Sequence, residues 1–195
     1  MANMIIKPAA DGNLLIQDRA GGAVLSTSTS GATLGNSTQD NITRLGTVTS
    51  GTLASTTTFP AGHIVQVKQV LIRDAFSSSS SSYVATDTTG SITPSDASNK
   101  VLVMINSVLD TSAASRTPTL MIYRNGVAVS NAGEGLMQAM DRGGGTRFPF
   151  SIHWLDSPNS PSAVTYTLYA KAASTFECPP YGNLDAQMTF FEIRG

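Results

Sequence analysis

Large apolar side chains occupy every second position along two stretches of the chain, and this period most limits what the chain can fold into. Over 148–155 the residues Phe, Phe, Ile and Trp alternate with smaller or polar ones, and over 164–171 Val, Tyr, Leu and Ala do the same. Successive side chains point to opposite faces in a strand. Both stretches therefore predict β-strands with one buried face.

Further β-branched stretches extend this pattern. Residues 64–73 and 100–109 are apolar on both faces, which predicts that each face meets a dry partner. Asn125-Gly126 lies between two apolar runs and predicts a hairpin with a two-residue type I′ turn. The last apolar run, 188–193, predicts a strand in the centre of a sheet, because a frayed end would not hold bulky side chains.

Helix signals are weak, and residues 136–140 are the best candidate for a helical turn. Ser, Thr, Pro and Gly separate the predicted strands, and the chain holds 24 Ser and 23 Thr among its 195 residues. Seven or eight short strands at this spacing predict an all-β chain with an antiparallel sandwich.

The composition divides the chain in two. Residues 1–58 contain no aromatic side chain, whereas 59–195 contain all of them. Large side chains supply most of the burial that a core needs, so we expect 59–195 to fold on its own core. We expect 1–58 to be an extended attachment arm or short β-stalk, with a hairpin over 13–27. Its scattered apolar residues leave two outcomes: the segment is disordered, or, as we expect, three copies wind around one axis and bury these residues together.

Charge and motif content exclude several functions. A net charge of −1 gives no field for nucleic acid. The longest apolar run is five residues, and no basic segment precedes an apolar one near the first residue, so we expect neither membrane insertion nor a signal peptide. Cys178 is the single cysteine. No pattern predicts a catalytic residue, a cofactor or a metal ligand, and we expect no enzyme.

One set of neighbouring residues has the side chains of a catalytic triad but not the spacing. Ser151, His153 and Asp156 supply the residue types of a triad, but neighbours on one strand do not reach triad geometry by themselves. A hydrolase acting on polysaccharide through acidic residues between 134 and 177 is a further alternative, although their spacing selects no pair.

Two segments resemble structural proteins of tailed bacteriophages. They are Ile-Thr-Pro-Ser-Asp-Ala-Ser-Asn-Lys-Val-Leu-Val at 92–103 and Leu-Met-Ile-Tyr-Arg-Asn-Gly at 120–126. Residues 15–25 are likewise similar to the attachment regions of such proteins. The resemblance implies a C-terminal jelly roll similar to the trimeric heads of tumour necrosis factor and complement C1q, and hence a homotrimer. It brings no catalytic residues.

The resemblance implies a capsid decoration (cement) or head-fibre protein that is made in the host cytoplasm and lies on the outer surface of the virion. Its partners would be its own copies and the major capsid protein or another virion protein. Apolar residues near the first residue are the candidates for capsid attachment: Leu14, Ile16, Val24, Leu25 and Leu34. Candidates for trimer packing, some of which must instead fill the core of each chain, are Val103, Ile105, Tyr123, Phe150, Trp154, Tyr166, Phe190 and Ile193.

The alternative is a tail-fibre or receptor-binding protein whose jelly roll recognises glycans on the host surface. Exposed loops at 141–147 and 156–160 would then carry specificity, because loops on a rigid scaffold are where recognition residues gather.

Overall fold

The computed structural model describes residues 5–8, 14–17, 20, 23–28, 31–34, 59–111, 117–139, 147–180 and 184–195. The chain divides into two units, Met1–Ser55 and Thr56–Gly195. Every regular element in the described ranges is a β-strand. No helix in these ranges has the length and hydropathy that a bilayer crossing requires.

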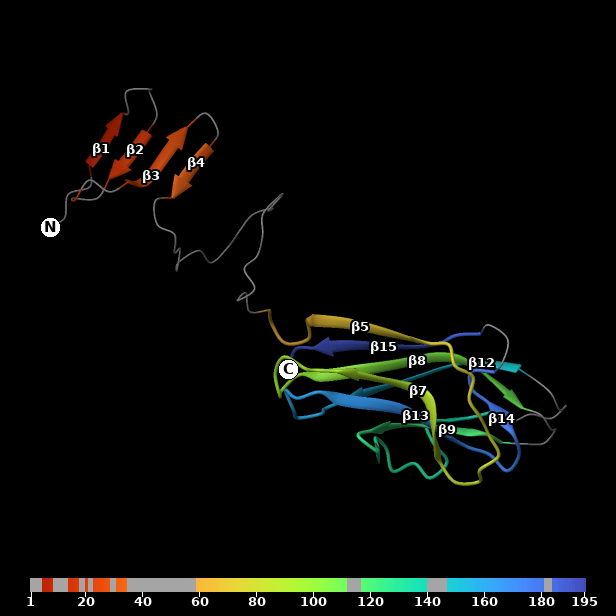
Figure 1. Ribbon diagram of the computed structural model, residues 1–195. Coiled ribbons are helices and arrows are strands. Elements are labelled where there is room, and N and C mark those ends of the chain that lie inside the picture. The colour runs from red at the N-terminus through yellow and green to blue at the C-terminus, as the bar shows by residue number, and fades with distance from the viewer. Residues whose placement is uncertain are drawn as a thin grey trace. The chain divides into compact units, whose positions relative to one another are not determined.

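The first unit holds a four-stranded antiparallel sheet in the order β1-β2-β3-β4 (Figure 1). The predicted hairpin over 13–27 is confirmed, because β2 pairs with β3 with Ile16 opposite Leu25. Strand β4 then extends the meander with Leu34 opposite Leu25. The strands are β1 (Ile5–Pro8), β2 (Leu14–Gln17), β3 (Ala23–Ser28) and β4 (Gly31–Leu34).

The second unit consists of two antiparallel sheets that pack face to face as a β-sandwich (Figure 1). The six-stranded sheet contains β5 (Ile64–Ile72), β15 (Ala186–Ile193), β8 (Lys100–Thr111), β14 (Phe176–Glu177), β6 (Ser77–Ser78) and β12 (Arg147–Asp156). The five-stranded sheet contains β10 (Val127–Ala128), β9 (Thr119–Arg124), β13 (Val164–Lys171), β7 (Val84–Ile92) and β11 (Met137–Gln138).

The core lies between the two sheets and is built by strict alternation. Along β8 and β15 every second residue is buried and its neighbour is half-buried. Strand β13 repeats the pattern from the opposite sheet. The aromatic ring of Tyr166 on β13 meets that of Phe190 on β15 with their centroids 5.7 Å apart. Burying one face of each sheet in this way supplies the apolar area that stabilises the sandwich.

Several predicted elements are confirmed. The strands expected at 148–155 and 164–171 are β12 and β13. Asn125 and Gly126 have φ angles of 48° and 81°, as a type I′ turn requires, and β9 pairs with β10 around them. Strand β15 lies between β5 and β8, which confirms its central position.

One expectation is wrong, and another stays untested. Residues 136–139 form no helical turn: β11 pairs with the edge of β9, because the neighbouring Gly135 has a φ of 78° and turns the chain back. Strand β5 lies at the edge of its sheet, and Ile72 is its one fully buried residue. The described residues leave the outer face of β5 uncovered, so the dry partner expected for that face of 64–73 stays a prediction.

Candidate functional site

The outer face of the six-stranded sheet, which points away from the core, carries a row of apolar residues that crosses four strands. Leu155 on β12 is opposite Leu102 on β8, Leu102 is opposite Phe191 on β15, and Phe191 is opposite Val67 on β5. Leu155 is 50% exposed and Val67 is 57% exposed, while the two central residues are half-buried. We call this row and the two rows beside it the outer apolar face.

The two neighbouring rows complete a face without charge. Residues His153, Met104, Thr189 and Gln69 form the second row, and residues Ser151, Asn106, Gln187 and Leu71 form the third. None of the twelve positions is Asp, Glu, Lys or Arg. An apolar centre depleted of charge is what distinguishes the middle of a protein–protein interface from ordinary surface. Strand β5 adds Val65, which is 38% exposed, at one end of this face.

The residues predicted to pack a trimer are mostly found in the core of the single chain. Five of the eight are buried between the two sheets: Val103, Ile105, Phe150, Tyr166 and Phe190. Four of these alternate with positions of the outer apolar face, and Tyr166 points inward from β13 of the opposite sheet. They fill the core, which was the other role foreseen for part of this set, and no surface remains on them for a neighbouring copy.

The other three are partly exposed but do not lie together. Trp154 packs against the core and lines a cavity of about 320 Å³ beside β12, together with Leu136 and Met137. Tyr123 stacks on Tyr169 on the outer face of the five-stranded sheet. Ile193 is half-buried at the end of β15.

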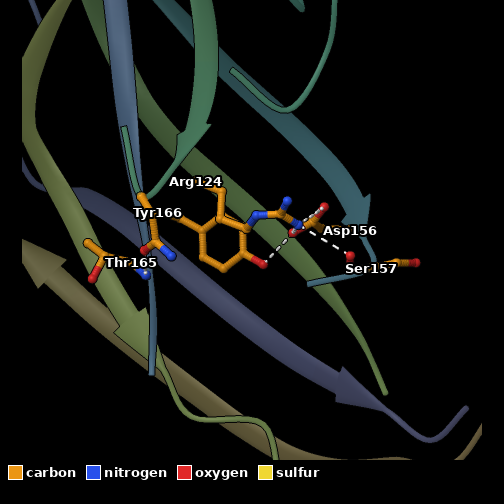
Figure 2. A network of polar contacts seen from close by, with 6 residues as sticks. Arg124, Asp156, Ser157, Thr165 and Tyr166 are labelled. Atoms are coloured by element: carbon orange, nitrogen blue, oxygen red, sulfur yellow. Dashed lines mark hydrogen bonds and ion pairs between the residues drawn. The ribbon is translucent and has the colours of Figure 1, made fainter. Parts of the chain in front are cut away.

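A polar network joins the two sheets at one end of the sandwich (Figure 2). Arg124 on β9 donates from Nη1 to both carboxylate oxygens of Asp156 at 3.0 and 2.8 Å and to the carbonyl of Ser157 at 3.2 Å. The hydroxyl of Tyr166 donates to Oδ2 of Asp156 at 2.7 Å. Burial first, and then the hydrogen bond to Asp156, raise the pKa of Tyr166, which keeps its hydroxyl protonated. Asp156 is therefore a structural group held between two sheets.

A second network surrounds the buried carboxylate of Glu192 on β15. Its Oε1 accepts from Ser95 N at 2.6 Å, Ser95 Oγ at 2.7 Å and Asn99 Nδ2 at 2.6 Å, and its Oε2 accepts from Gln66 Nε2 at 2.9 Å. Ser95 and Asn99 belong to the segment 92–103 that carries the phage resemblance. That segment therefore acts by anchoring a buried carboxylate, and its Asp96 caps the turn by accepting from Ser98 N at 2.8 Å.

Burial alone would raise the pKa of the Glu192 carboxyl. The hydrogen bonds from Asn99, Ser95 and Gln66 outweigh burial, so the pKa lies below its ordinary value. Ionised Glu192 is thus favoured in the folded protein. Sequence reasoning missed this residue, because a glutamate in the alternation of 186–193 gives no sign that four donors converge on it.

The candidates for capsid attachment occupy related positions in the small sheet. Ile16, Leu25 and Leu34 are successive register partners on β2, β3 and β4, and Ile6 on β1 continues the row opposite Ile16. Ile16 and Leu25 are half-buried. Leu14 and Val24 belong to β2 and β3 but lie outside this row.

The loops expected to read glycans differ in outcome. Residues 141–146 lie outside the described residues. In the loop at 156–160, the Asp156 carboxylate and the Ser157 carbonyl are engaged by Arg124.

Cys178 is fully buried, and burial raises the pKa of its thiol to about 12. In the described ranges no three His, Cys, Asp or Glu side chains gather closely enough to hold a metal ion.

Comparison with solved structures gives 14 matching chains, including two from infectious bursal disease virus. The chain is similar to a chain in the structure of the Gt strain of infectious bursal disease virus, with a TM-score of 0.42 and 11% identity over 75% of this chain and 47% of that one. It is similar to a mutant VP2 protein of the same virus in derived T=1 particles, with a TM-score of 0.38 and 14% identity over 83% of this chain and 45% of that one. The chain thus spans less than half the length of either. No protein-family model and no curated protein matches it.

Proposed function

We propose that the protein is a non-enzymatic structural protein of a bacteriophage virion: a homotrimeric capsid decoration protein with a jelly-roll head. In this proposal residues 1–58 attach to the major capsid protein, and three sandwiches pack together on the outer surface of the capsid. Three linked attachments raise the overall affinity without strong individual contacts, so each trimer clamps several capsid subunits.

The observation that carries the proposal is the outer apolar face. Its twelve positions cover about 400 Å² in projection, from the usual strand spacing and rise, which suits the apolar centre of an interface surrounded by a polar rim. Half-exposed aliphatic residues such as Val67 and Leu155 would each contribute about 1 kcal/mol if a neighbour covered them. A second copy fits because it brings no charge to the contact. The resemblance of 92–103 to phage structural proteins supports the same conclusion.

Light scattering of the full chain tests the trimer. We expect a mass of three times 20.3 kDa for the native protein. Val67→Asp combined with Leu155→Asp places six carboxylates in the contacts of each trimer and should give a monomer. The matched control is Thr167→Asp, on the outer face of the five-stranded sheet, which should leave the trimer intact. A native protein that is monomeric at micromolar concentration contradicts the proposal.

Purified particles test the attachment. Quantitative labelling should find hundreds of copies spread over the capsid, whereas a handful at the tail would favour the fibre alternative. Leu25→Asp in the row across the small sheet should reduce the number of copies per particle. Ser26→Asp is its control, because neighbouring residues of a strand lie on opposite faces.

A further inference from the structure

A second surface of the sandwich carries a small cavity of about 190 Å³, lined by polar side chains together with Ala172 and Ala173. It lies at one end of the five-stranded sheet, where β9 begins beside the end of β13, and the segment that leads into β11 completes it. Thr119 comes from β9, Lys171 from β13, and Glu134 and Gln138 from the segment before and within β11. The cavity belongs to the opposite sheet from the outer apolar face.

The hydroxyl of Thr119 is the group in this cavity whose burial the surrounding packing does not explain. The residue is 2% exposed, and its hydroxyl has no hydrogen-bond partner among the described residues. A buried hydroxyl without a partner costs about 1–3 kcal/mol. Such a group at the lining of a cavity indicates that the cavity accepts a molecule with polar atoms to offer.

The other polar groups are held in place and keep unused bonding capacity. Lys171 Nζ donates to the carbonyl of Gly133 at 3.1 Å and lies 4.7 Å from the centre of the Tyr83 ring. Gln138 Nε2 donates to Glu134 Oε2 at 3.2 Å. An ammonium group has three donors and a carboxylate has about four acceptor sites, so both can bind a further molecule.

This set of groups matches a neutral polyhydroxylated ring. Each sugar hydroxyl both donates and accepts, and the cavity offers a donor in Lys171, an acceptor in Glu134 and a group of both kinds in Thr119. The charges of lysine and glutamate cancel, which favours a neutral ligand over an acidic one. The volume is below the roughly 300 Å³ of sites for drug-sized molecules, so it suits one ring.

An aromatic cluster lies beside the cavity, where a longer ligand could contact it. Tyr123 and Tyr169 are stacked with centroids 3.8 Å apart, and Tyr83, under the Lys171 ammonium, is 6.1 Å from Tyr123. All three rings are half-buried. Burial, with the neighbouring Tyr83 and Tyr169, raises the pKa of Tyr123, so its hydroxyl stays neutral. Flat apolar rings beside hydrogen-bonding groups can accommodate the apolar face of a neighbouring sugar.

We propose that this cavity binds one neutral hexose unit of a polysaccharide, with Lys171, Glu134 and Thr119 as its hydrogen-bonding residues. The proposal does not rest on capsid decoration: a trimer on a capsid and a fibre tip could each carry the site. Failure of sugar binding would leave the trimer test untouched, and a monomeric protein would leave this cavity unchanged.

Calorimetric titration of the full-length protein with glucose, galactose, mannose and short neutral oligosaccharides of each tests the proposal. We expect one of these series to bind, with the oligosaccharide tighter than its monosaccharide. Lys171→Met and Thr119→Val should each weaken binding about tenfold, the loss expected for one hydrogen bond of 1.4 kcal/mol. Lys68→Met on β5, an exposed lysine of the other sheet, is the control and should not change binding.

Thr119→Val has a second readout. Removing an unpartnered buried hydroxyl should leave the melting temperature of the sugar-free protein unchanged or raised while binding is weakened. A purely structural threonine would give the opposite change in melting temperature. If Thr119→Val fails to fold, Glu134→Gln serves instead, because Glu134 is exposed. Absence of binding to every neutral sugar, preference for an acidic sugar or a free amino acid, or binding that these variants leave unchanged would each overturn the proposal.

Discussion

The hydroxyl of Tyr166 on β13 donates a 2.7 Å hydrogen bond to Oδ2 of Asp156, the last residue of β12, and so ties one sheet of the sandwich to the other. Arg124 reaches the same carboxylate from β9. The carboxylate is almost fully buried, so it needs both donors to replace the water it has lost. This contact is thus part of what fixes the relative position of the two sheets.

Tyr166→Phe should therefore destabilise the protein by about 1.5–3 kcal/mol, the usual contribution of a hydrogen bond to a charged group. The ring keeps its packing against Phe190, so the change isolates the hydroxyl. Denaturant unfolding measures the effect, and Asp87→Asn, an exposed carboxylate on β7, is the control with no expected change. Tyr166→Phe in an Asp156→Asn background should cost less than in the native protein. Equal costs in the two backgrounds would show that the two residues are not coupled.

Glu192 should make stability depend on pH in the acid range. Its pKa is lowered in the folded protein, so the unfolded chain binds a proton first as the pH falls. The contribution of the carboxylate is complete above its unfolded pKa of about 4.3 and is lost as the pH falls through the lower folded value. Unfolding measured from pH 7 to pH 3 should show this loss.

Glu192→Gln is the variant that tests this assignment. It removes the charge and replaces one carboxylate oxygen with an amide nitrogen, which cannot accept a hydrogen bond from Gln66 or from Ser95 and Asn99, so we expect a loss of about 3 kcal/mol at pH 7. The difference from the native protein should shrink as the pH falls through the lowered pKa of the folded protein, because the native carboxyl is then itself protonated. Glu134→Gln, an exposed carboxylate, is the control. A difference that stays constant with pH would show that Glu192 acts by packing and not by charge.

The apolar patterns were sufficient to predict β12, β13 and β15, because apolar side chains predominate on one face of each strand. Strand β7 could not be found this way. Its inward positions are Thr86, Thr88, Gly90 and Ile92, so three of the four lack a large apolar side chain. Thr86 is tolerated inside because its hydroxyl donates to the carbonyl of Leu168 at 2.9 Å. Such a partner is supplied by the fold and leaves no local trace in the sequence.

The candidate site, too, could be predicted from the sequence only in part. Alternation separates the two faces of β8 and β15 but does not say which face points inward, since both are apolar. Val103 and Phe190 are among the candidates for trimer packing, some of which were expected to fill the core instead, and the structure places both in the core. Leu102 and Phe191, one position away, are on the outer apolar face. Which of the two faces of β8 and β15 is buried is decided only by the opposite sheet, which packs against one of them.

Gly126→Ala should destabilise the hairpin by about 1 kcal/mol. The added Cβ would have open space around it, but the φ of 81° is one that residues with a Cβ rarely adopt. Gly133→Ala is a matched control, because its Cβ also has open space and its φ is not in the positive region. Thermal unfolding of the two variants separates backbone strain from crowding. An equal loss in both would show that turn geometry is not the cause.

Gly90→Ala should destabilise the protein by overpacking where the two sheets approach most closely. A Cβ at Gly90 would lie 3.0 Å from the ring of Phe190 and 3.1 Å from Cγ2 of Val70, both on the facing sheet. Extra carbon in a well-packed core costs about 1–3 kcal/mol, because the neighbours are held by their own packing.

Phe190→Leu should remove part of this cost. The smaller side chain leaves room for the methyl group, so the double variant should be more stable than the sum of the two single losses predicts. The coupling is measured by denaturant unfolding of the four proteins of the cycle. Met188→Leu is the control partner, since Met188 lies in the same buried row of β15 but is not among the nearest atoms to Gly90. Additive losses in both cycles would mean that the strain at Gly90 arises from its own backbone and not from the ring across the sandwich.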